Sequence, residues 1–167
     1  MTVAITQEHN EARLAGTLSF LDAGTNSARL RIYGGTRPPN PAATPTSAML
    51  VEIALTKPAG TIAGGLLTLT QQEDGLIAAT GIATWARLVN GNEVTALDLD
   101  CSGTDGAGDV KLASTNLYLG GDARMVSAIG MPPSSFTASH APSFTRRPAL
   151  RSASSRLTWY ERKGMSP

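Results

Sequence analysis

The chain has 167 residues and a formal net charge of +1, and only 16% of its residues are charged, against the roughly one quarter that is usual in soluble domains. Its length and its 41% of hydrophobic residues allow it to bury a core of its own without metals or disulfides. The single cysteine, Cys101, excludes an internal disulfide and a multi-cysteine metal site, and we expect it to be a small buried hydrophobe. No run approaches the roughly 18 apolar residues of a membrane span, and no signal peptide is recognisable, so we expect a soluble protein without membrane contact.

The sequence predicts a single helix, at residues 6–23. Thr6 or Asn10 is a suitable N-cap, and an apolar stripe follows at helical spacing. The stripe is only about two turns long, so this helix needs a partner surface, either a sheet edge or a neighbouring subunit. We interpret three leucines as contacts for such a partner: Leu14, Leu18 and Leu21.

Short alternating segments separated by glycine and proline predict a series of strands along the rest of the chain. A loop at residues 36–45 holds four prolines and separates the first two strands. A second turn is expected at 58–60, and a glycine-rich loop at 103–108. Strands are expected at residues 28–33, 48–57, 66–70, 110–112, 117–119 and 123–129.

Residues 76–101 predict a long hairpin at the centre of the fold. Asn90-Gly91 supplies the two positive φ angles that a tight hairpin turn requires. Before the turn, the residue types alternate along a predicted strand. One face of that strand would carry Ile82, Thr84, Ala86 and Leu88, and the other would carry Ala83, Trp85, Arg87 and Val89. The fold class is therefore mainly β, an antiparallel β-sandwich or barrel-like body with one short N-terminal helix and an extended C-terminal arm.

The composition changes after Gly130. Residues 131–167 are rich in proline and serine and carry six basic residues against one acid, a net charge of +5, which leaves −4 for residues 1–130. We divide the chain into a helix segment (1–24), a β body (25–130) and a basic arm (131–167). The interleaved aromatic residues favour an arm that binds a groove on a partner over a tail that binds nucleic acid, although both remain open. The expected anchors of the arm are Phe136, Phe144, Arg146, Arg147, Trp159 and Tyr160.

One stretch has the ligand spacing of a calcium loop, with carboxylate or hydroxyl oxygens at intervals and a glycine at the sixth position. Its flanks read as strands rather than helices, so we favour a solvent-facing strand end over a metal site. The candidate ligands are Asp98, Asp100, Ser102 and Asp109.

Catalytic motifs are weak. His9 and His140 are the only histidines, one at the helix start and one in the arm, so a histidine-based triad would have to be built on these two regions, and we interpret both as surface residues. The glycine-rich residues 59–65 lack the Lys-Ser/Thr ending of a phosphate loop and read as a turn. We expect no enzymatic activity and no cofactor.

Three segments resemble a group of small virion proteins from tailed bacteriophages and prophages. Residues 28–39 (ARLRIYGGTRPP) are similar to that group's strand and loop of the type LRIYDGTRP, with Gly34 in place of the aspartate. Residues 79–87 (ATGIATWAR) are similar to its GTATWFR strand, and residues 110–127 to its terminal segment. The likeness covers about residues 11–129.

This resemblance implies a structural component of the phage particle, made in the host bacterial cytoplasm and located in the virion. Its partners would be copies of itself and other virion subunits, and it would have no catalytic residues. A surface- or carbohydrate-binding module is an alternative, with stacking aromatics Tyr33, Trp85 and Tyr118. A nucleic-acid-binding protein acting through the basic tail is another.

Overall fold

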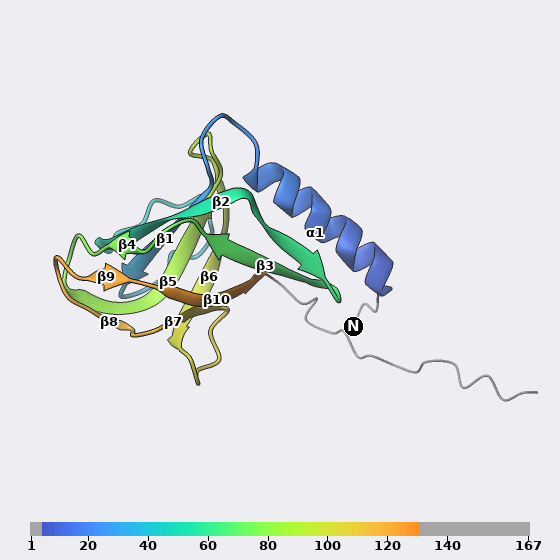
Figure 1. Cartoon of the computed structure of the whole chain (residues 1–167). Coiled ribbons are helices and arrows are strands. Elements are labelled where there is room, and N and C mark those ends of the chain that lie inside the picture. The colour runs from blue at the N-terminus through green and yellow to red at the C-terminus, as the bar shows by residue number, and fades with distance from the viewer. Residues whose placement is uncertain (1–4, 131–167) are drawn as a thin grey trace, which may run out of the picture. The chain divides into compact units, whose positions relative to one another are not determined.

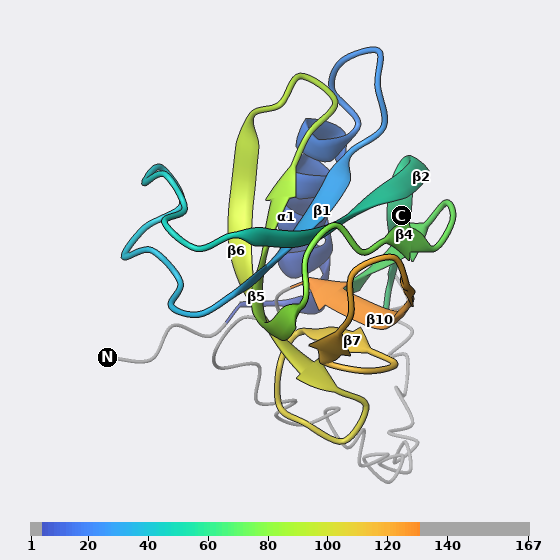
Figure 2. The ribbon, with the colours of Figure 1, turned by 90° about the vertical axis from the view of Figure 1, so that its left-hand side faces the viewer.

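The computed structural model describes residues 5–130, with the side chains of 127–130 excepted. One helix, α1, lies across one end of a strongly curved β-sheet (Figures 1 and 2). The predicted arm of residues 131–167 and all six of its anchors lie outside the described residues. No helix in the described part of the chain has the length and apolarity that a membrane span requires.

The helix prediction is confirmed, and α1 runs from Gln7 to Leu21. Thr6 is the N-cap, and its Oγ1 accepts a hydrogen bond from the His9 backbone N–H at 3.2 Å. Asp22 caps the other end, and its carboxylate accepts from the Ala59 N–H at 2.9 Å, which ties the helix end to the sheet. Asn10 is buried and donates to the Gly65 carbonyl at 2.6 Å, so this residue anchors the helix and does not cap it.

Ten strands follow, and the mainly β class is confirmed. They are β1 (Arg29–Gly34), β2 (Met49–Ala63), β3 (Leu66–Gln71), β4 (Gly75–Leu76), β5 (Gly81–Val89), β6 (Thr95–Gly103), β7 (Val110–Leu112), β8 (Asn116–Leu117), β9 (Asp122–Ala123) and β10 (Met125–Gly130). Eight of them form one sheet in the order β1-β2-β3-β10-β7-β6-β5-β8. An additional pairing of β1 with β5 brings this sheet round on itself, so the described body is the barrel-like alternative, nearly closed.

The expectation of a purely antiparallel sheet is wrong for one pair, because β6 and β7 run parallel, with Cys101 opposite Val110. Parallel neighbours need a connection that returns to the start of the first strand. The glycine-rich loop makes that return within a few residues because it lies directly on β6. A Cβ on Gly108 would stand 2.8 Å from the Asp100 carbonyl oxygen, and one on Gly106 would stand 2.4 Å from the Ser102 Cβ.

The expected end of the second strand at residues 58–60 is also wrong. β2 continues to Ala63, and its pairing with β3 shifts between Leu55 and Gly60. A proline is tolerated at such an irregularity because no ladder N–H is needed there. The turn comes later, at Gly64-Gly65, where φ is +59° and +76° and where Ala63 pairs with Leu66.

The β5–β6 hairpin is confirmed, but its turn is wider than the one expected. Neither Asn90 nor Gly91 has a positive φ, and Glu93 takes it instead (φ 65°). The Asn90 Oδ1 accepts the N–H groups of Asn92 and Val94, both at 3.0 Å, which shapes a longer loop. Glycine is required at 91 because a Cβ would stand 2.0 Å from the Asn26 carbonyl oxygen of the α1–β1 connection.

The main core fills the inside of the curved sheet and is closed at one end by α1. Leu14 and Leu21 of the helix are buried in it, so the sheet supplies the partner surface that the short apolar stripe needs. Its largest fully buried members are Leu21, Leu30, Ile32, Ile53, Leu55, Leu67, Leu88, Leu112, Val51 and Val110.

Candidate functional site

A second buried layer lies on the outer face of the sheet, beneath the proline-rich loop that joins β1 to β2. The rings of Tyr33 and Trp85 are stacked there with centroids 4.3 Å apart and an angle of 10° between their planes. Both are buried, at 7% and 1% exposure, yet neither belongs to the core inside the sheet. Two arginines hold the loop down: Arg87 donates to the Ala43 carbonyl at 2.8 Å, and Arg37 to Asp100 at 2.9 Å.

The predicted carbohydrate platform of Tyr33, Trp85 and Tyr118 is therefore not assembled. The first two rings are covered and stack on each other, while Tyr118 is 68% exposed beyond β8, away from them. The expected alternation along β5 breaks because the β1–β5 register shifts between Tyr33 and Gly34. Ala83 consequently packs in the inner core while Trp85 lies outside it.

A buried ion pair stands next to the aromatic stack. Arg87 Nε donates to Asp98 Oδ1 at 2.7 Å, and Arg87 Nη2 donates to Asp98 Oδ2 at 2.9 Å, with the side chains 6% and 4% exposed. The hydrogen bonds to Asp98 raise the pKa of the Arg87 guanidinium above its ordinary value. The guanidinium carbon also lies 5.6 Å from the centroid of the Trp85 ring. Asp98, predicted to face solvent, is thus the carboxylate that neutralises a buried cation.

Three of the four calcium candidates make other contacts. Asp98 is taken by Arg87, and Asp100 by Arg37. The Ser102 hydroxyl accepts from the Gly108 N–H and from Lys111, both at 3.1 Å, and so fixes the loop that ends near Asp109. Within residues 5–130 no three His, Cys, Asp or Glu side chains come together as a metal site. The calcium spacing is a consequence of strand alternation and a glycine-rich turn.

Cys101 and His9 have ordinary surroundings. The Cys101 side chain is partly buried against the core, and burial raises the pKa of its thiol to about 12, which opposes reactivity. His9 is exposed on the first turn of α1, while His140 lies outside the described residues.

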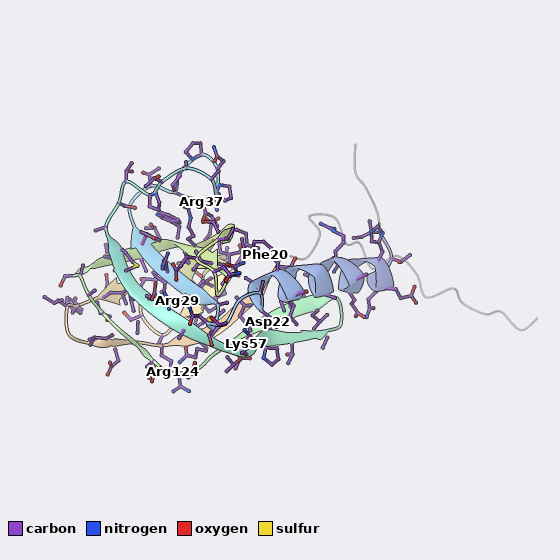
Figure 3. The ribbon with its side chains drawn as sticks, turned by 90° about the horizontal axis from the view of Figure 1, so that it is seen from above. Phe20, Asp22, Arg29, Arg37, Lys57 and Arg124 are labelled. Atoms are coloured by element: carbon purple, nitrogen blue, oxygen red, sulfur yellow. The ribbon has the colours of Figure 1, made fainter. Side chains whose placement is uncertain are left out.

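A groove runs between α1 and the strands at this end of the sheet. It has a volume of about 490 Å³, and its walls are mostly apolar. Helix residues form one wall and β3, β5 and β6 the other, with Leu14, Phe20, Leu67, Leu88, Leu97 and Leu99 among them. Phe20 is 41% exposed at the C-terminal end of α1, and Figure 3 shows it on the other side of the helix end from Asp22 and Lys57.

The prediction that three helix leucines contact a partner subunit is corrected by their burial within the chain. Leu14 and Leu21 are buried inside the chain, at 5% and 0% exposure, so they are not available as contacts for a neighbouring subunit. Leu18 is partly buried against the same core. The periodicity correctly identified an apolar face, but the partner of that face is the chain's own sheet.

Four large apolar side chains are exposed at the opposite end of the sheet, where β4, β8 and β9 gather (Figure 1). Each is 61–68% exposed, and we call them the end patch: Leu76, Ile82, Tyr118 and Leu119. Ile82 pairs with Asn116, so Tyr118, two residues further along, is its diagonal neighbour on the same face. The 76–80 and 118–121 segments are held together by hydrogen bonds, including Gly120 N–H to the Ile77 carbonyl at 2.9 Å.

The sequence does not indicate the end patch, because its members come from separate segments, the start of β5, the two-residue strand β4 and the turn after β8, which only the fold brings together. The sequence does not indicate the groove either, since its walls come from four separate segments.

Comparison of the chain with family models, curated proteins and solved structures found no significant match.

Proposed function

We propose that the chain is a non-enzymatic structural subunit of a tailed-bacteriophage particle, as capsid decoration, in the neck or in the tail. It acts through contacts with copies of itself and with other virion subunits. The end patch is the observation that supports this most directly. Its four apolar side chains remain 61–68% exposed in segments that meet at one end of the body, with Ile82 and Tyr118 as diagonal neighbours, and large apolar side chains exposed in one region are typical of a surface that a protein partner covers.

The build of the body supports the same role. A subunit that is repeated many times in a particle needs one fixed shape so that all its contacts are alike. The β1–β5 pairing, the capped helix and the tethered proline loop each restrict the shape of this chain. The likeness of residues 28–39 and 79–87 to phage virion proteins supplies the kind of assembly.

The self-association part is tested by the mass of the purified protein in solution, measured by light scattering over a range of concentrations. Ile82→Ser with Tyr118→Ser should lower the mass of the oligomer or raise its dissociation constant at least tenfold. Val94→Ser is the matched control, because Val94 is 50% exposed but belongs to the turn at the other end of β5. A wild-type protein that stays monomeric at all concentrations would contradict self-association.

The virion part is tested in particles from the strain that encodes the chain. Quantitative mass spectrometry of purified particles should find the protein in a constant ratio to the major capsid protein. The double variant should be lost from particles while Val94→Ser is retained. Particles that lack the wild-type protein would overturn the assignment.

The two alternatives stand differently. A glycan-binding module is disfavoured because Tyr33 and Trp85 are covered, which leaves Tyr118 as the one exposed ring of the three. Binding to nucleic acid depends on Arg146, Arg147 and the other basic residues of 131–167, outside the described residues. Its signature would be an affinity for DNA that falls steeply with salt concentration.

A further inference from the structure

The groove beneath α1 lies at an interruption in the sheet. β7 begins at the level of Cys101, so Thr95–Asp100 of β6 pairs with β5 on one side and, among residues 5–130, with no strand on the other. On the far side of the interruption, Ile129 and Gly130 of β10 pair with β3 and with no second strand of the described chain, because the β10–β7 pairing ends at Ala128 and Val110. The backbone edge of β6 is thus open where the sheet would otherwise close.

The direction of the chain at this point is informative. β10 is antiparallel to β7, and β7 is parallel to β6, so β10 runs antiparallel to β6. An extended continuation of β10 beyond Gly130 would therefore have the direction of an antiparallel strand beside the open edge of β6. Gly130 pairs with Leu67, which itself lines the groove, so the chain leaves β10 at the rim of the cavity.

We propose that residues 131–137 add a strand to the open edge of β6 and that Phe136 occupies the groove. The sequence of this segment is MPPSSFT, with prolines at its second and third positions and the phenylalanine at its sixth. Six extended residues reach about 20 Å, and the open edge from Thr95 to Asp100 spans about 17 Å, so the lengths agree. Prolines near the start of an added edge strand are tolerated, and main-chain pairing with one side-chain anchor is an established mode of strand addition.

The occupant is the chain's own segment rather than that of a second copy. Because the segment is joined directly to Gly130, its effective concentration at the groove is in the millimolar range, well above that of another protein molecule in dilute solution. The groove is filled in this way wherever the protein assembles, so the inference is independent of the proposed function.

The test is a disulfide trap in the full chain, with Cys101→Ala to remove the native thiol. Ala96→Cys lines the groove and is combined with Phe136→Cys. A disulfide requires Cα atoms within about 7 Å, so it forms quickly only if the segment lies in the groove. We expect an intramolecular disulfide, identified by peptide mass, to form at least tenfold faster than with Val126→Cys in place of Ala96→Cys. Val126 is the matched control because it lies on the exposed face of β10.

Hydrogen exchange gives a second measurement that needs no new thiols. Phe136→Ser should speed exchange of the amides of residues 95–100 at least tenfold, while Phe144→Ser should leave it unchanged. Disulfide-linked dimers as the main product would assign the groove to the segment of a second copy and overturn the proposal. Equal trapping by Val126→Cys, or unchanged exchange in Phe136→Ser, would also overturn it.

Discussion

Removing the Asp98 carboxylate should destabilise the fold strongly, because it leaves the Arg87 guanidinium buried without its counter-ion. Asp98→Ala deletes two charge-assisted hydrogen bonds, of 2.7 and 2.9 Å, between side chains that are 4–6% exposed. Breaking one side of a buried pair typically costs about 3–5 kcal/mol. Arg87 keeps its bond to the Ala43 carbonyl, so we expect the lower end, about 3 kcal/mol.

Urea unfolding followed by circular dichroism measures this change. With a slope of about 2 kcal/mol per molar urea, a loss of 3 kcal/mol lowers the midpoint by about 1.5 M without altering the slope. Asp100→Ala is the matched control on the same strand, because Asp100 also pairs with an arginine but its side chain is 62% exposed. Its cost should stay below about 1 kcal/mol.

A double variant separates the ion pair from the burial itself. Arg87→Met with Asp98→Leu fills the same space with apolar groups and should lie within about 1 kcal/mol of the wild type, since a buried pair is often replaceable in this way. If Asp98→Ala costs no more than Asp100→Ala, the reasoning about a buried, mutually dependent pair is refuted.

Three further predictions concern titration and glycine positions. Burial raises the pKa of the Cys101 thiol from 9.0 to about 12, so the unfolded chain loses this proton at lower pH than the folded chain does. The contribution of Cys101 to the free energy of unfolding should therefore be complete below pH 9 and fall by about 1.4 kcal/mol per pH unit above it. Cys101→Ala should reduce the dependence of the urea midpoint on pH between about pH 8 and 11. Gly91→Ala should cost about 1–3 kcal/mol, read as a lower melting temperature, because its Cβ would meet the Asn26 carbonyl oxygen at 2.0 Å, whereas Gly103→Ala, with nothing within 4 Å, should not destabilise. Gly16→Ala in α1, also with open space, should raise the free energy of unfolding by about 0.5–1 kcal/mol in the same urea assay.

The candidate surfaces could be read from the sequence only in part. The apolar stripe of α1 was visible, since Leu14 and Leu21 recur at helical spacing, but whether a sheet or a second subunit covers them depends on where the helix packs. The aromatic side chain of Tyr118 is evident from the sequence, but its proximity to Ile82 is not, because the β5–β8 pairing joins residues far apart in the chain.

Local rules were sufficient wherever the determining interactions are close in sequence. Thr6 caps α1 through a residue three positions away, and the β5–β6 hairpin forms between adjacent segments of period two. The mainly β class, the helix and most strand positions follow from such patterns. They depend on backbone geometry and on the alternation of side chains, which any window of the chain already contains.

Tertiary structure decided everything that depends on distant segments. Asp98 alternates as a surface residue does, yet the loop that follows β1 covers it and pairs it with Arg87 in a dry environment. The parallel β6–β7 pair and the interruption beside it result from a loop that folds back over β6. Which face of a strand is covered, and by what, is set by contacts between parts of the chain that alternation alone does not relate.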